Sequence, residues 1–84
     1  MKAREVAPEE ILAVIENQIR DSEPPITRQT LNRLLLGQIP REEAVELMAV
    51  VLVDEIEAMM SEDRGFDLER YTALLKALPT LPDD

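Results

Sequence analysis

A ten-residue apolar stretch sets the strongest limit on how this chain can fold. Residues 44–53 read AVELMAVVLV and contain a single charged side chain, Glu46. At helical spacing, the apolar residues from Ala44 to Met60 cover roughly 240° of the circumference, whereas a surface helix needs only about 100°. The helix that contains this stretch must therefore be covered from two or three sides, by the rest of the chain or by a second copy of it.

The composition excludes several kinds of chemistry. Cysteine and histidine are absent, which removes disulfide bonds, thiolate nucleophiles, the commonest general base and the commonest ligand of borderline metals. The chain has 2 glycines, too few for a phosphate-binding loop. We therefore expect a protein that is not an enzyme and has no cofactor.

The length of 84 residues predicts one helical domain over residues 1–84. Residues 1–6 lack the apolar core of a signal peptide and are expected to form a loose arm, and residues 79–84 a frayed acidic tail. The longest apolar run is far shorter than the ~20 residues that cross a membrane. A soluble, cytoplasmic protein is therefore expected.

Hydrophobic periodicity predicts an all-α fold, a small four-helix domain around a long central third helix. The expected helices span about residues 8–21, 28–36, 40–62 and 68–78. Pro8 and Pro40 suit the first position of a helix, where the missing N–H costs nothing. Thr27 is expected to cap the second helix and Asp67 the fourth, because both side chains can accept a backbone N–H.

Glycines and paired apolar residues mark the other helix boundaries. Gly37 is expected to end the second helix and Gly65 the third, because glycine is favoured just after a helix. Hydrophobic staples, in which the residue before the cap packs on the first turn, are expected at three helix starts. The staple pairs are Val6 with Ile11, Ile26 with Leu31, and Phe66 with Tyr71.

The negative charge is concentrated on the third helix. The formal net charge is −9, and the segment from Glu42 to Asp63 holds acidic residues and no basic one. This charge repels phosphate backbones and anionic lipid, so neither direct nucleic-acid binding nor membrane binding is expected. One helix face carries a narrow acidic strip, formed by Glu43, Glu46, Asp54 and Glu57. The strip is either a solvated face or a face for a basic partner, as in an acidic inhibitor that mimics nucleic-acid charge.

Carboxylates are the remaining candidates for chemistry. Glu55 falls in the middle of the apolar arc, and a buried carboxylate must be paired or protonated. Arg33, Arg20 or Lys76 could pair with it, and the alternative is a catalytic acid with a raised pKa. The i,i+3 carboxylate pairs of the strip could hold hard cations, but they lie about 16 Å apart along the helix. A carboxylate-metal enzyme is thus a further alternative, and no specific metal ligand is assigned.

Several short motifs resemble a family of small bacterial helical domains of unknown function. The motifs are Asn17-Gln18, Pro24-Pro25, Arg33-Leu34, Arg41-Glu42-Glu43 and Phe66-Asp67-Leu68-Glu69-Arg70-Tyr71. The resemblance covers roughly residues 12 to 78 and implies the same helical fold. The family pattern has Arg-His-Glu-x-x-His and Pro-Phe-Asp, whereas this chain has Glu42 and Glu46 at both histidine positions and Gly65 at the proline. Any histidine metal site of the family would be lost here or changed to oxygen ligation.

The excess apolar arc favours self-association. We expect a non-catalytic interaction module that forms a homodimer and buries this surplus surface. The residues expected to carry subunit contacts are Val45, Leu52, Ile56, Met59 and Met60. The acidic strip would then face solvent or a basic protein.

Overall fold

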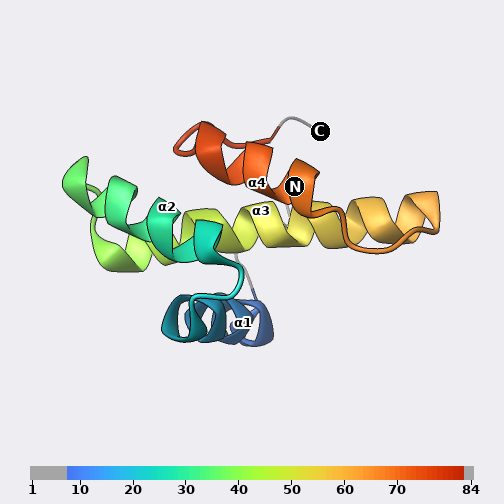
Figure 1. Ribbon diagram of the computed structural model, residues 1–84, viewed down its shortest axis with the longest axis horizontal. Helices are drawn as coiled ribbons and strands as arrows, with labels where there is room; N and C mark the ends of the chain where they lie inside the picture. The colour runs from blue at the N-terminus through green and yellow to red at the C-terminus, as the bar shows by residue number, and fades with distance from the viewer. Residues whose placement is uncertain (1–7, 83–84) are drawn as a thin grey trace.

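The computed structural model describes residues 8–82, which form four α-helices and no strand (Figure 1). The helices are α1 (Glu9–Asp21), α2 (Pro25–Leu36), α3 (Arg41–Glu62) and α4 (Leu68–Ala77). This arrangement confirms the predicted all-α, four-helix fold with a long third helix. None of the helices in residues 8–82 combines the length and the hydropathy that a membrane crossing requires.

The 22-residue helix α3 is the centre of the fold and contacts α1, α2 and α4. In Figure 1, α1 lies on one side of α3, while α2 and α4 lie on the other. The largest fully buried apolar side chains come from α1, α3, α4 and the residue that follows α4: Ile15, Met48, Val51, Tyr71, Leu75 and Leu78. Most of the wide apolar arc of α3 is therefore covered by the chain itself, as its width requires.

Two helices begin one residue later than the prolines predicted. Pro8 and Pro40 are the caps before α1 and α3, with extended ψ angles of 152° and 148°. Their carbonyl oxygens accept the first helical hydrogen bonds, from Leu12 N–H at 3.1 Å and from Ala44 N–H at 2.9 Å. A cap residue keeps non-helical ψ while its carbonyl is already part of the helix, which accounts for the shift.

Helix α2 begins earlier than predicted, and Thr27 is not its cap. Pro24 precedes the helix in an extended conformation, and Pro25 is its first residue, where proline is well tolerated. Thr27 is fully buried in the first turn, and its hydroxyl donates to Gln18 Oε1 at 2.7 Å. The expected Ile26 staple is wrong for the same reason, because Ile26 already lies inside the helix.

The remaining boundaries agree with the sequence except at the end of α3. Gly37 follows α2 as predicted, but Asp63, with a φ of 53°, ends α3 in place of Gly65. Asp67 caps α4 and accepts a hydrogen bond from Arg70 N–H at 3.1 Å, which confirms that prediction.

The staple at the start of α4 is confirmed. The rings of Phe66 and Tyr71 meet edge to face, with centroids 5.1 Å apart. This contact fixes the direction from which the chain enters the helix. The staple between Val6 and Ile11 and the predicted arm over residues 1–6 lie outside the described residues, because Val6 is not among them.

Candidate functional site

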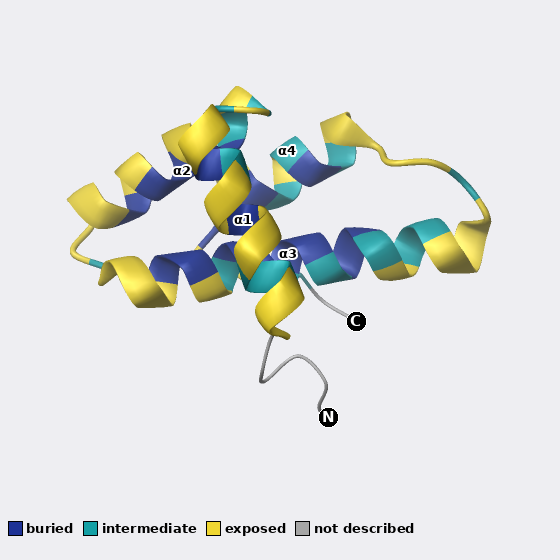
Figure 2. Ribbon diagram, turned by 90° about the horizontal axis from the view of Figure 1, so that it is seen from below, coloured by how far each residue is buried: buried dark blue, intermediate teal, exposed yellow. Residues whose placement is uncertain are grey.

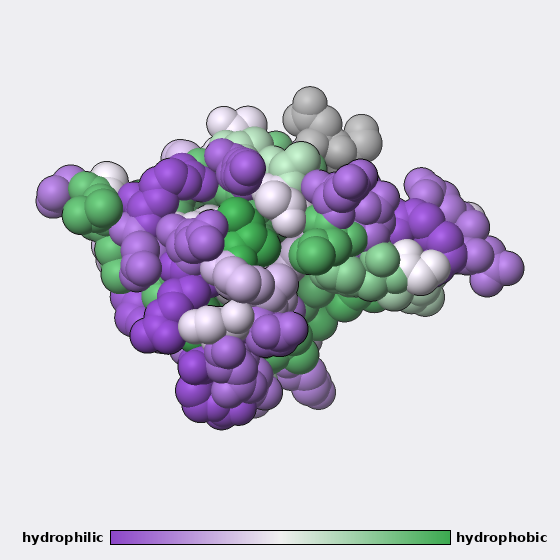
Figure 3. Space-filling model, in the orientation of Figure 1, coloured by the Kyte–Doolittle hydropathy of each residue, from purple (hydrophilic) through white to green (hydrophobic). Residues whose placement is uncertain are grey.

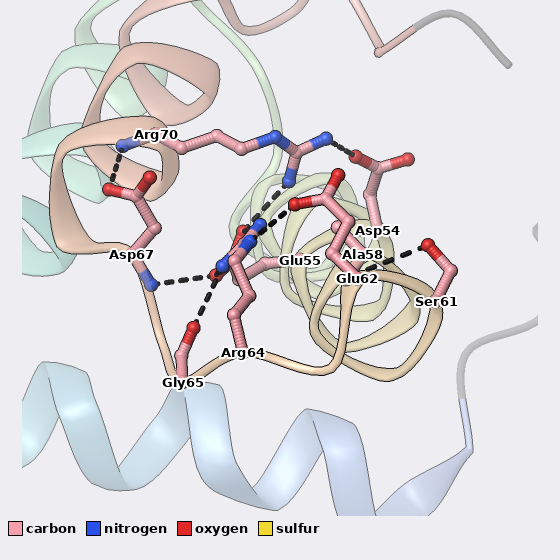
Figure 4. Close-up of polar contacts among 9 residues, drawn as sticks. All are labelled: Asp54, Glu55, Ala58, Ser61, Glu62, Arg64, Gly65, Asp67 and Arg70. Atoms are coloured by element: carbon pink, nitrogen blue, oxygen red, sulfur yellow. Dashed lines mark hydrogen bonds and ion pairs between the residues drawn. The ribbon is translucent and has the colours of Figure 1, made fainter.

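A buried carboxylate joins α3 to the start of α4. Glu55 is fully buried, and both of its carboxylate oxygens are saturated with donors (Figure 4). Oε2 accepts from Arg64 Nη1 at 2.9 Å and from the Asp67 N–H at 2.8 Å. Oε1 accepts from Arg70 Nη1 at 2.8 Å and from Arg64 Nη2 at 3.3 Å. We call Asp54, Glu55, Arg64 and Arg70 the charged junction.

The partners of Glu55 differ from the three basic residues proposed from sequence. Arg33 donates instead to the carbonyl oxygens of Leu78 at 2.8 Å and Leu75 at 2.9 Å, at the carboxyl end of α4. Arg20 pairs with its neighbour Asp21, and Lys76 has no part in the pairing of Glu55. The chain turns back after α3, and this return brings Arg64 and Arg70 to the carboxylate. The sequence signal for this pairing was the position of Arg64 and Arg70 on either side of Asp67, the predicted cap of the fourth helix.

Electrostatics keep Glu55 ionised. Its pKa is lowered to about 2, chiefly by the hydrogen bond from Arg64, with further help from the Asp67 N–H and Arg70 and against the effect of burial. A general acid needs a pKa near the working pH, so the alternative of a catalytic acid at Glu55 has no support in this geometry. The carboxylate is a structural ion-pair partner.

Asp54 belongs to the charged junction, which corrects its assignment to the exposed acidic strip. Arg70 Nη2 donates to Asp54 Oδ2 at 2.6 Å, and the Asp54 side chain is only 11% exposed. The first turn of α4 packs beside this face of α3, so Arg70 reaches across and covers the carboxylate. The strip is thereby reduced to Glu43, Glu46 and Glu57, all of which are exposed.

Two of the five predicted self-association residues are wrong. Val45 and Leu52 are 5% and 4% exposed, because α1, α2 and α4 already cover their part of α3. The last two turns of α3 extend beyond the other helices, and the connection to α4 returns beside them (Figure 2). Figure 3 shows apolar surface over this half of α3.

The apolar residues of these last turns form what we call the α3 end: Ile56, Met59 and Met60. Ile56 and Met59 are half-buried, and Met60 is 77% exposed. Phe66, in the connection that follows, is also exposed. The molecule therefore keeps an uncovered apolar region at one extremity, although most of the arc is internal.

A groove of about 490 Å³ lies between α1 and α3. Its lining residues are Leu12, Glu16, Arg41, Glu42, Val45 and Glu46. Arg41 donates to both carboxylate oxygens of Glu16, at 2.8 Å and 2.9 Å. Glu42 and Glu46, the positions where the family pattern has histidines, are exposed.

The acidic residues of the described part of the chain do not converge on a metal site. Within residues 8–82, no group of three or more His, Cys, Asp or Glu side chains is arranged to hold a metal ion. A carboxylate-metal centre thus has no cluster of oxygen ligands to occupy in the described part of the chain.

A second buried polar cluster was not predicted from the sequence. Gln18 Oε1 accepts hydrogen bonds from Thr27 Oγ1 at 2.7 Å and from Tyr71 Oη at 2.9 Å. These three residues, which we call the neutral junction, join α1, α2 and α4. Burial of the Tyr71 ring raises the pKa of its hydroxyl, which stays a proton donor at neutral pH. The only sign of the neutral junction in the sequence was the presence of polar residues in the motifs Asn17-Gln18 and Arg70-Tyr71.

Comparisons with protein-family models, with curated proteins and with solved structures find no match for this chain. The resemblance to the family of small bacterial helical domains stays a prediction from the motifs.

Proposed function

We propose that the protein is a non-catalytic interaction module that self-associates through the α3 end. The observation that carries this proposal is the contrast within one helix: Val45 and Leu52 are covered by the chain, whereas Met60 is 77% exposed. Burying one such methionine removes apolar surface worth about 1.5–3 kcal/mol from water. A second copy of the chain has the same α3 end, so a symmetric dimer would bury the α3 end of both copies.

Charge makes this proposal testable. Two copies that each carry a net charge of −9 repel one another, and added salt screens that repulsion. Self-association through apolar contacts should therefore strengthen as the salt concentration rises. Binding of a basic protein to the acidic surface should weaken under the same change.

The experiment is sedimentation velocity of the full chain over a range of concentrations, at low and at high salt. We expect a dimer at high protein concentration that dissociates on dilution and is favoured by salt. Met60→Glu should shift the chain to monomer. A wild-type chain that stays monomeric at every concentration would overturn the proposal.

The matched control is Leu36→Glu. Leu36 is 84% exposed and ends α2, at the opposite extremity of the molecule from the α3 end (Figure 1). Leu36→Glu adds the same charge as Met60→Glu at an apolar residue that is similarly exposed, so self-association should be unchanged. An equal loss in both variants would show that added charge, not the α3 end, controls association.

The second candidate function is binding of a basic protein, as expected of an acidic inhibitor or a charge mimic. It is favoured by the exposed carboxylates of Glu43, Glu46 and Glu57, which remain on one side of α3 after Asp54 is assigned to the charged junction. Complementary charge steers association and makes it salt-sensitive.

A further inference from the structure

The groove between α1 and α3 combines an apolar lining with an acidic edge. Its apolar lining is the half-buried Leu12 from α1, together with Val45 from α3, of which only 5% is exposed. Glu42 and Glu46 lie four residues apart on α3, one helical turn along the edge. At that spacing, Cβ atoms are about 5–6 Å apart, so two carboxylates can accept from one cation.

The charge of the groove is set by two carboxylates. Arg41 is bound to both oxygens of Glu16, so these two lining residues neutralise one another. Within residues 8–82, neither Glu42 nor Glu46 has an ion pair or a hydrogen bond from another side chain. The groove therefore offers two negative charges above an apolar surface.

We propose that this groove binds a lysine or arginine side chain of a partner protein. The apolar stem of the side chain would lie on Leu12, next to the small exposed part of Val45, and its cationic head would bridge Glu42 and Glu46. Long basic side chains place their stems on apolar surface in this way and keep the charge at the edge. Charge-assisted hydrogen bonds to two carboxylates would hold the head. This inference rests on the second candidate function and is independent of self-association.

Other ligands fit the groove less well. A phosphate or a nucleic acid is repelled by the two carboxylates. A metal ion held by the two carboxylates would complete its coordination with water and leave the apolar lining unused. A basic side chain uses both the apolar lining and the acidic edge.

The experiment is an NMR titration of the ¹⁵N-labelled full chain with a synthetic helical peptide of leucine and lysine. We expect the largest amide shifts at Leu12, Val45 and Glu46. Glu42→Gln combined with Glu46→Gln should weaken binding by at least about tenfold, since both acceptors of charge are lost. A peptide with norleucine in place of lysine, which keeps the stem and removes the charge, should lose binding at the groove.

The matched control is Glu10→Gln combined with Glu69→Gln. These exposed residues carry the same charge, and they belong neither to the groove nor to the acidic strip. Binding to this variant should fall less than about twofold, the effect of a change in net charge alone.

Three outcomes would overturn the inference. Equal loss in the two double variants would mean that diffuse acidic attraction holds the peptide, which overturns the groove and leaves the second candidate function standing. Absence of binding to the wild-type chain would overturn both. Shifts at the groove that depend on protein concentration without peptide would identify a second copy of this chain as the occupant, in place of another protein.

Discussion

The two polar junctions both provide hydrogen-bond partners for polar groups buried between helices, but they use different chemistry. The neutral junction joins α1, α2 and α4 through one amide oxygen and two hydroxyl donors. The charged junction joins α3 to the start of α4 through two carboxylates and two guanidinium groups. Among the described residues, no buried side-chain nitrogen or oxygen lacks a hydrogen-bond partner.

The difference lies in what happens when one member is removed. A lost neutral hydrogen bond leaves a dipole without a partner, which typically costs about 1–3 kcal/mol. A lost ion-pair partner leaves a buried charge, which typically costs about 3–5 kcal/mol. The charged junction should therefore be the more sensitive of the two to substitution, and the only one that responds to acid.

The largest effect is expected from Arg64→Met. This change removes two of the four donors to the buried Glu55 carboxylate. It should lower the free energy of unfolding by about 3 kcal/mol, as measured by urea denaturation. The control is Arg20→Met, since Arg20 pairs with Asp21 on the surface, where solvent screens the pair and its loss should change stability little. Equal losses in the two variants would contradict the importance of the junction.

Of the two junctions, only the charged one should be weakened by acid. The pKa of Glu55 is lowered to about 2 in the folded chain from its ordinary value of 4.5, so the folded state holds this proton less tightly than the unfolded state. The stabilisation is therefore fully present above about pH 4.5 and is lost as the pH falls towards about 2. Glu55→Gln should flatten the dependence of unfolding free energy on pH across this window.

The comparison variant for the acid experiment is Tyr71→Phe, which alters the neutral junction. Its stability should follow the same slope between those pH values as the wild type, because no group of the neutral junction titrates there. Parallel curves for Glu55→Gln and the wild type would mean that other carboxylates account for the acid sensitivity.

A smaller loss is expected from Tyr71→Phe at neutral pH. The hydroxyl donates to Gln18 Oε1, which still accepts from Thr27 after the change, so about 1 kcal/mol should be lost. Combination with Thr27→Val leaves the oxygen without either donor. Calorimetric or urea unfolding should then show a loss greater than the sum of the single changes. A strictly additive result would count against a shared acceptor.

The smallest effect is expected from Glu16→Gln. Its two hydrogen bonds from Arg41 are well formed, but both side chains are about half exposed, at 46% and 52%. An exposed pair typically contributes about 0.2–1 kcal/mol, and salt reduces it further. The difference from the wild type should be small in dilute buffer and vanish at high salt. A loss as large as that of Arg64→Met would break the distinction between exposed and buried pairs.

The sequence was sufficient for the helices and for the burial of Glu55. Periodic apolar residues are a property of each segment, so the four helices could be predicted without knowing how they pack. The one-residue errors at Pro8 and Pro40 were local, whereas the larger error at the start of α2 arose where a tertiary contact decided the outcome. Thr27 has the side chain of a cap, but Gln18 offers its hydroxyl a buried acceptor, and α2 begins two residues before it.

The ion-pair partners of the acidic residues on α3 were harder to predict than the positions of those residues on the helix. Glu55 lies on the apolar arc whatever the fold, but its pairing with Arg64 and Arg70 depends on the path of the chain between α3 and α4. Asp54 was misplaced for the same reason, since Arg70 covers it. The width of the arc on α3 indicated how much apolar surface the helix carries. It did not indicate which parts of that surface the chain itself covers, such as Val45 and Leu52.

The anchoring of α4 has a consequence for how the molecule comes apart. This 10-residue helix is too short to persist alone in water. Its first turn is tied to Glu55 of α3, and its last carbonyl groups are tied to Arg33 of α2. An excised peptide of residues 64–82 should be a random coil, and α4 should lose its amide protection against hydrogen exchange in one step when either anchor is cut.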